Sequence, residues 1–118
     1  MNKKEIGNLG EDLALRYLEQ LDYRIVERNF ECRQGEIDIV AMDQYKKELV
    51  FVEVKTRRNF LFGNPIDGVS ENKKKHMIKA VKYYLHRRDL ENRFIRLDVI
   101  EIYLGKHRYK VNHIKQIV

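Results

Sequence analysis

Hydrophobic residues recur at helical spacing in two segments of the chain. Residues 3–21 predict an amphipathic helix, because their apolar side chains fall three or four positions apart. A second helix is predicted to begin after Ser70, whose hydroxyl can cap it, and to run to about Arg88. The inward positions of the two helices are Ile6, Leu9, Leu13, Tyr17 and Leu21, followed by Met77, Ile78, Val81, Tyr84 and Leu85.

Five further segments have the alternation or the β-branched and aromatic content of strands. They cover residues 23–31, 35–42, 49–55, 93–104 and 108–114. Residues 57–68 contain Asn, Gly and Pro, which predicts a loop between the third strand and the second helix. The resulting order is α-β-β-β-α-β-β. We therefore predict one α/β domain over residues 1–118, with a central mixed sheet flanked by helices.

The second and third strands are joined by a short polar connection, so we expect them to pair antiparallel. Their alternation predicts one apolar face, because a shift of one residue would expose half of the core. The opposite face then receives Asp38, Glu53 and Lys55. If Asp38 lies opposite Glu53, their Cβ atoms are about 5 Å apart. The residues expected on the apolar face are Ile37, Ile39, Val50, Val52 and Val54.

Two carboxylates that close are unfavourable when both are ionised, unless a cation lies between them. Their hard oxygen atoms suit Mg²⁺ or Mn²⁺, which keep several waters and bind through one or two protein carboxylates. The alternative is an ordinary ion pair of Lys55 with Asp38 or Glu53 on a half-solvated face of the sheet. A D…ExK pattern this short also arises by chance.

The first predicted helix contains two glycines that need a reason. Gly7 and Gly10 each cost about 1 kcal/mol relative to alanine in a helix interior. Glu11 lies beside them at the edge of the apolar stripe, among small residues that permit a close approach to the sheet. One explanation is that the helix delivers a third carboxylate to Asp38 and Glu53. The other is a surface glutamate on a helix whose glycines serve packing alone.

Composition narrows the class of protein. The 118 residues are 43% hydrophobic, which is enough for one core, and no apolar run approaches the length of a membrane span. The first residues do not form a signal peptide, and the single Cys32 excludes an internal disulfide, so we expect a soluble cytoplasmic protein. The net charge of +6 favours an anionic partner such as nucleic acid, although a merely basic domain would have the same charge.

Several stretches resemble the small bacterial YraN-like proteins of the PD-(D/E)xK nuclease superfamily, which are related to archaeal Holliday-junction resolvases. The stretches are GNLGEDLALRYLEQLDYRIVERNF, GEIDIVA and VFVEVKTR, followed in family order by SENK, YYL and RLDVI. The resemblance covers nearly the whole chain. One departure is Asp22, where the family has glycine, and this position lies in a turn outside the expected site.

The resemblance implies a restriction-endonuclease-like fold and a role for each matching residue. Asp38 and Glu53 would bind the metal, Lys55 would be the catalytic lysine, and Glu11 would be an accessory carboxylate. Lys73 matches a family lysine near the start of the second helix. The implied activity is Mg²⁺- or Mn²⁺-dependent endonuclease cleavage of DNA, including branched or otherwise structured DNA. The alternative is a non-catalytic nucleic-acid-binding module that retains the fold.

Basic and aromatic residues around the motif are the candidates for binding the substrate. Arg57, Arg58, Lys73 and Lys74 lie nearest the expected site and are predicted to contact phosphates. Lys75, Lys79, Lys82 and His86 are interpreted as a solvated helix face. Phe60 and Phe62 would pack in a dimer interface or wedge into a nucleic-acid junction. Asp98 would support the site or pair with an arginine on a neighbouring strand. Kinship with resolvases implies a homodimer, since two symmetric nicks need two sites.

Overall fold

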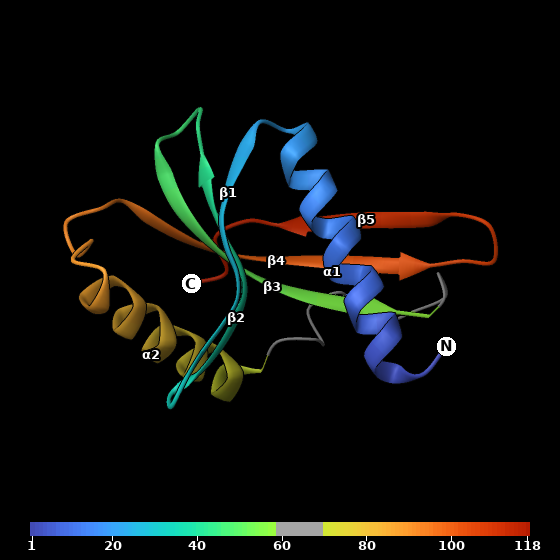
Figure 1. The fold of residues 1–118 in the computed structure, drawn as a ribbon, viewed down its shortest axis with the longest axis horizontal. Helices are drawn as coiled ribbons and strands as arrows, with labels where there is room; N and C mark the ends of the chain where they lie inside the picture. The colour runs from blue at the N-terminus through green and yellow to red at the C-terminus, as the bar shows by residue number, and fades with distance from the viewer. Residues whose placement is uncertain (59–69) are drawn as a thin grey trace.

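The computed structural model describes residues 1–58 and 70–118. Its elements follow the predicted order (Figure 1). They are α1 (Lys3–Gln20), β1 (Tyr23–Cys32), β2 (Gly35–Asp43), β3 (Glu48–Arg57), α2 (Glu71–Arg87), β4 (Ile95–Leu104) and β5 (Tyr109–Ile114).

The described strands form one five-stranded sheet in the order β1-β2-β3-β4-β5. Neighbours pair antiparallel except for β3 and β4, which are parallel because α2 crosses between them. The predicted α/β fold class, with a central mixed sheet flanked by helices, is therefore confirmed. None of the described helices has the length and apolarity needed to cross a bilayer.

Both helices begin with the caps that their sequences suggest. The Asn2 side chain accepts a hydrogen bond from the Glu5 amide at 2.8 Å, and the Glu5 side chain accepts one from the Asn2 amide. The Ser70 hydroxyl accepts from the Lys73 amide at 3.1 Å, as predicted. After α1, Asp22 adopts φ +65°, a left-handed conformation that explains why glycine suits this turn and that aspartate tolerates.

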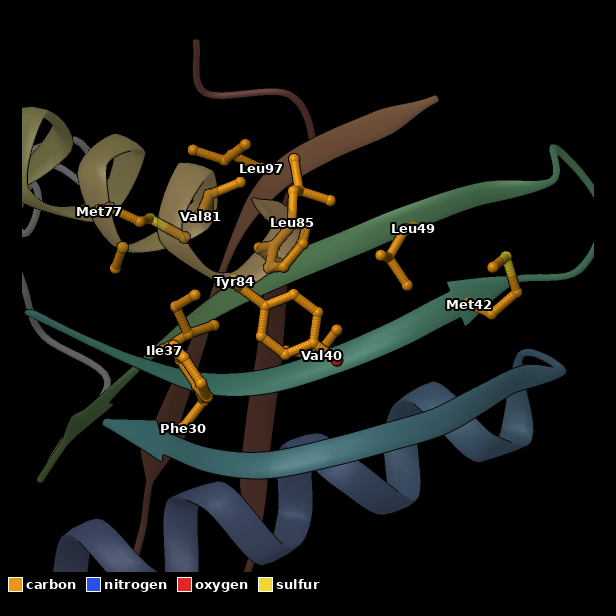
Figure 2. Close-up of a cluster of buried hydrophobic side chains, with 12 residues drawn as sticks. Phe30, Ile37, Val40, Met42, Leu49, Met77, Val81, Tyr84, Leu85 and Leu97 are labelled. Carbon is orange, nitrogen blue, oxygen red and sulfur yellow. The ribbon is translucent and has the colours of Figure 1, made fainter. Parts of the chain in front are cut away.

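Alternating residues of the sheet divide the core between its two faces. On one face, buried side chains of β1, β2 and β3 pack beneath α2, where Tyr84 makes an edge contact with Phe30 (Figure 2). Tyr84 makes a second edge contact with Phe51 of β3. On the other face, Ala14 and Leu18 of α1 pack on a second cluster. The strand residues of this α1 face include Ile39, Ala41, Val50, Val52, Ile100 and Ile102.

The prediction for Ile37 is wrong in one respect. Ile39 lies on the α1 face with Val50 and Val52, but Ile37 packs in the cluster beneath α2, together with its cross-strand partner Phe30 (Figure 2). The neighbouring strand β1 is irregular here, because Asn29 has φ +54° and the register shifts at the bulge between Ile25 and Glu27. The twisted end of the hairpin therefore turns towards α2, where strict alternation predicted the opposite face.

The α1 face also contains a buried ionic network. The Arg96 guanidinium donates to both carboxylate oxygens of Asp98 at 2.9 and 3.0 Å and to Asp43 at 3.0 Å. His113 lies 2.7 Å from Asp98 and 3.0 Å from the Tyr17 hydroxyl. Hydrogen bonds from His113 and Arg96 outweigh burial and lower the pKa of Asp98. The network joins β4 and β5 to α1.

Candidate active site

The predicted carboxylates lie where the sheet divides. The ladder between β2 and β3 ends at the pair Ile39–Val52, one pair before the expected Asp38–Glu53. Beyond this point β2 continues to pair with β1, while β3 continues to pair with β4 as far as Arg57. The two central strands therefore separate, as Figure 1 shows. We call this opening, bounded by Asp38 on β2 and Glu53–Lys55 on β3, the fork.

Asp38 closes the base of the fork. Its Oδ2 atom accepts a hydrogen bond of 2.8 Å from the Val54 amide of β3. A side chain therefore links the two strands just beyond the last backbone pair between them. Burial and the nearby Glu53 carboxylate raise the pKa of Asp38 to about 7, and the Val54 hydrogen bond opposes this only in part. Asp38 is therefore held in place at a considerable electrostatic cost.

Glu53 projects towards α2 and is only 8% exposed. Its Oε1 atom lies 2.6 Å from the Lys73 ammonium and 3.5 Å from the Lys55 ammonium. Burial and the neighbouring Lys73 lower the pKa of Lys55, although Glu53 acts in the opposite direction. Burial alone would lower the pKa of Lys73 too, but its hydrogen bond with Glu53 raises it overall. The two lysines thus share one carboxylate oxygen and differ in how strongly they hold their protons.

Close packing of α1 on β3 brings Glu11 to the same site. A Cβ atom at Gly10 would lie 1.8 Å from the Thr56 hydroxyl oxygen, so only glycine permits this approach. The packing explanation does not extend to Gly7, since a Cβ there would meet no atom within 4 Å. Burial raises the pKa of Glu11, with Arg28 opposing it from 3.8 Å, and the Oε1 atom of Glu11 is buried without a hydrogen-bond partner.

In the part of the chain that the structure describes, two cavities open from the fork, with volumes of about 380 and 780 Å³. Three residues line both of them: Asp38, Glu53 and Lys73. The smaller cavity is further lined by Gly35, Glu36, Ser70, Asn72, His76 and Met77. The larger one is further lined by Met1, Asn2, Lys3, Ile6, Gly7, Glu11, Val54, Lys55, Thr56 and Arg58. All four predicted catalytic positions therefore border the larger cavity.

The predicted phosphate-binding residues differ in their positions. Arg58 lines the larger cavity and donates to the Met1 carbonyl at 2.9 Å, and Lys73 lines both cavities. Arg57 lies 4.0 Å from Glu101, outside both cavity linings. Lys74 is paired with Glu71 at 3.4 Å and also borders neither cavity.

Asp98 and the basic residues on the outer face of α2 border neither cavity of the site. Asp98 pairs with Arg96 on its own strand, on the opposite face of the sheet from Glu53, so the expectation that it supports the site is wrong. The row of basic residues on the outer face of α2 is exposed, as interpreted. Phe60 and Phe62, with the loop around them, lie outside the described residues.

Sequence reasoning missed several residues at the site. The start of α1 borders the larger cavity, and Asn72 and His76 border the smaller one, because of how the two helices dock. Glu101 was also missed; it is fully buried beside Lys55 in the β3–β4 register, and its Oε2 atom has no hydrogen-bond partner. The alternation of DVIEIYL could have indicated an inward glutamate at this position.

The donor set at the fork fits a hard divalent cation. Among the described residues, no three His, Cys, Asp or Glu side chains are arranged as a ready-made metal site. Asp38 and Glu53 nevertheless provide two carboxylates from adjacent strands, and Glu11 adds a buried oxygen without a hydrogen bond in the same cavity. Mg²⁺ and Mn²⁺ accept one or two carboxylates and complete their coordination with water. The mutual repulsion of these acids is what such a cation would relieve.

Comparison with known proteins gives a consistent family match. The model of the uncharacterised protein family UPF0102 matches residues 10–102. The chain is similar to a UPF0102 protein of Clostridium perfringens, with 46% identity over 95% of this chain and 92% of the relative. A UPF0102 protein of Carboxydothermus hydrogenoformans is 42% identical over 100% of this chain and 98% of the relative.

The chain is also similar, at a greater distance, to a solved structure. It is a repair endonuclease from Pyrococcus abyssi, with a TM-score of 0.43 and 16% sequence identity. The similarity covers 84% of this chain but only 39% of that longer chain. A likeness this distant carries no argument about the site or the substrate.

Proposed function

The chain belongs to the uncharacterised protein family UPF0102, and from the chemistry of its site we propose that it is a metal-dependent endonuclease that hydrolyses phosphodiester bonds in DNA. The resemblance to the YraN-like family that the sequence indicated is thereby confirmed. The family description assigns no activity, so the proposal depends on the residues themselves.

The observation that carries the proposal is the grouping of acids and lysines at the fork. Asp38, Glu53, Glu11 and Lys55 come from three elements and border one cavity of about 780 Å³. A purely structural ion pair would leave no reason to gather three carboxylates, one buried and two half-buried, since their repulsion destabilises the fold. Strongly perturbed groups gathered in a cavity are typical of catalytic sites.

Each residue has a distinct part in the proposed reaction. Asp38 and Glu53 would hold a Mg²⁺ or Mn²⁺ ion, with Glu11 as an accessory carboxylate. When bound, the ion would supply a water of lowered pKa and stabilise negative charge on the phosphoryl oxygens. Lys55, kept near the site by Glu53, would orient the attacking water or neutralise charge that develops on the phosphate. The Val54 amide fixes the Asp38 oxygen so that both carboxylates keep their places.

Positive groups around the larger cavity favour a polyanionic substrate. Lys3, Lys55, Arg58 and Lys73 all border it, and the whole chain carries a net charge of +6. Lysine and arginine contacts to phosphates position nucleic acid without reading its sequence. We further propose, from kinship with resolvases, that branched or otherwise structured DNA is cleaved and that the protein acts as a homodimer.

The test separates chemistry from binding. The purified protein is incubated with linear, nicked, flapped and four-way DNA in the presence of Mg²⁺ or Mn²⁺, and we expect cleavage of at least one substrate. Asp38→Asn and Lys55→Met should each abolish it. By fluorescence anisotropy in chelator, Asp38→Asn should keep or slightly strengthen DNA binding, because it removes a negative charge from the phosphate-binding cavity. Circular dichroism establishes that both variants fold.

A non-catalytic nucleic-acid-binding module is the second candidate. The observation in its favour is that the described residues form no ready-made site of three metal ligands. Failure to cleave any substrate with either metal, together with intact DNA binding, would establish this alternative. If Asp38→Asn folds but loses DNA binding, or retains full cleavage, the proposed site is wrong.

A further inference from the structure

Glu53 is held by a lysine from a different element of the fold. The Lys73 ammonium lies 2.6 Å from Glu53 Oε1, compared with 3.5 Å for Lys55 on the same strand as Glu53. Charge-assisted contacts of this length are among the strongest that side chains make. The principal partner of Glu53 is therefore Lys73, which lies in the first turn of α2.

Lys73 borders the cavities lined by the carboxylates that would hold a metal ion. Asp38, Glu53 and Lys73 are the three residues common to both cavities, so the ammonium group lies beside the same acids that a divalent cation would neutralise. A cation that binds Glu53 Oε1 must compete with Lys73 for that oxygen. The lysine thus stabilises the acids of the metal-free protein in the way that a metal would.

The Lys73 side chain also has room to rotate while the backbone of α2 stays in place. The Ser70 cap fixes the backbone amide of Lys73, whereas the Lys73 side chain is 43% exposed. The Lys55 side chain, at 23% exposed, is more enclosed. An ammonium released from Glu53 would have a cavity on either side of it. Displacement of Lys73 therefore requires only a rotation of a flexible side chain.

We infer that Lys73 is a resident counter-ion of the proposed metal site, which a divalent cation displaces from Glu53 and which then binds a phosphate of the nucleic-acid backbone. This inference rests on the proposed function and adds to it a coupling between metal binding and nucleic-acid binding. Metal binding frees a cationic side chain for the nucleic acid, so each ligand should increase the affinity for the other.

The first experiment measures metal affinity without any nucleic acid. Isothermal titration calorimetry with Mn²⁺ compares the wild-type protein with Lys73→Met, which keeps an unbranched side chain, shorter by one atom, but removes its charge. We expect Lys73→Met to bind Mn²⁺ about tenfold more tightly, since no ammonium competes for Glu53. Lys79→Met is the matched control, because Lys79 lies on the exposed outer face of the same helix and borders neither cavity. Its affinity for Mn²⁺ should stay within about twofold of wild type.

A second experiment measures the coupling. DNA affinity is measured by fluorescence anisotropy under two conditions. One contains chelator, and the other contains Ca²⁺ as the divalent cation. The gain in DNA affinity on adding Ca²⁺ should be several-fold larger for wild type and Lys79→Met than for Lys73→Met. Lys73→Gln provides a second neutral side chain if Lys73→Met does not fold, with circular dichroism as the check.

The outcomes distinguish this inference from the proposed function. If wild type binds Mn²⁺ but Lys73→Met binds it equally or more weakly, Lys73 is not a competing counter-ion, while the metal-dependent function stands. If wild type binds no divalent cation at all, both are overturned. An equal gain in DNA affinity for all three proteins would show that the displaced lysine does not bind the phosphate.

Discussion

Replacement of Asp38 by asparagine should remove a pH-dependent loss of stability from the metal-free protein. Burial and Glu53 raise the pKa of Asp38 to about 7, from an ordinary value of 3.8. Asparagine is nearly the same shape, and its side-chain oxygen can still accept the hydrogen bond from the Val54 amide. The substitution therefore deletes the charge while keeping the contact that closes the fork.

The size and sign of the effect follow from the two pKa values. Between pH 3.8 and about 7 the folded protein keeps a proton on Asp38 that the unfolded chain has lost, so the free energy of unfolding falls as the pH rises. An interval of about 3 pH units, at about 1.36 kcal/mol for each, corresponds to a loss of about 4 kcal/mol. The loss is complete above about pH 7 and absent below pH 3.8.

Urea denaturation in chelator at pH 5, 6, 7 and 8 measures this loss directly. Wild type should become less stable across the series, and Asp38→Asn should show a flatter profile and exceed wild type at pH 8 by a few kcal/mol. Glu19→Gln, an exposed substitution in the last turn of α1, is the control and should retain the wild-type slope. If Asp38→Asn has the same pH dependence as wild type, Asp38 does not carry the electrostatic cost that we assign to it.

Three further outcomes test the packing, the network and the partner. Gly10→Ala should lower the free energy of unfolding by about 1–3 kcal/mol through its clash with Thr56, whereas Gly7→Ala should raise it by about 1 kcal/mol; thermal melts that rank them in reverse would refute the docking of α1. Arg96→Met should cost about 3–5 kcal/mol in urea, because buried carboxylates lose their counter-charge, and a cost below about 1 kcal/mol would contradict this. DNA affinity should fall by about 0.9 log units per phosphate contact for each log unit of salt, and salt-insensitive binding would argue against a phosphate-directed surface.

The order of elements could be predicted because each one has a strong local pattern. Helical spacing marks both helices, the Ser70 cap marks the start of α2, and alternation marks the central strands. The face of Ile37 could not be predicted, since it depends on the left-handed Asn29 and on a bulge in the neighbouring strand. Alternation assumes regular pairing, and these irregularities come from tertiary structure.

The site was predictable to a similar extent. The alternation of residues along β2 and β3 placed Asp38 and Glu53 near each other. The glycines of α1 pointed to close packing beside Glu11. The fork and the contact of Glu53 with Lys73 depend on where β2 leaves β3 and on how α2 docks. No local sequence pattern predicts the fork or the Glu53–Lys73 contact, and the sequence therefore indicates only a phosphate contact for Lys73.

The contact between Gly10 and Thr56 also constrains how the family can evolve. A larger residue at position 10 is tolerated only if position 56 loses volume in the same lineage, because the two backbones are held at a distance that leaves room for one side chain. The two positions should therefore vary as a pair among relatives. A chimaera that takes α1 from one homologue and β3 from another must carry both residues from the same parent.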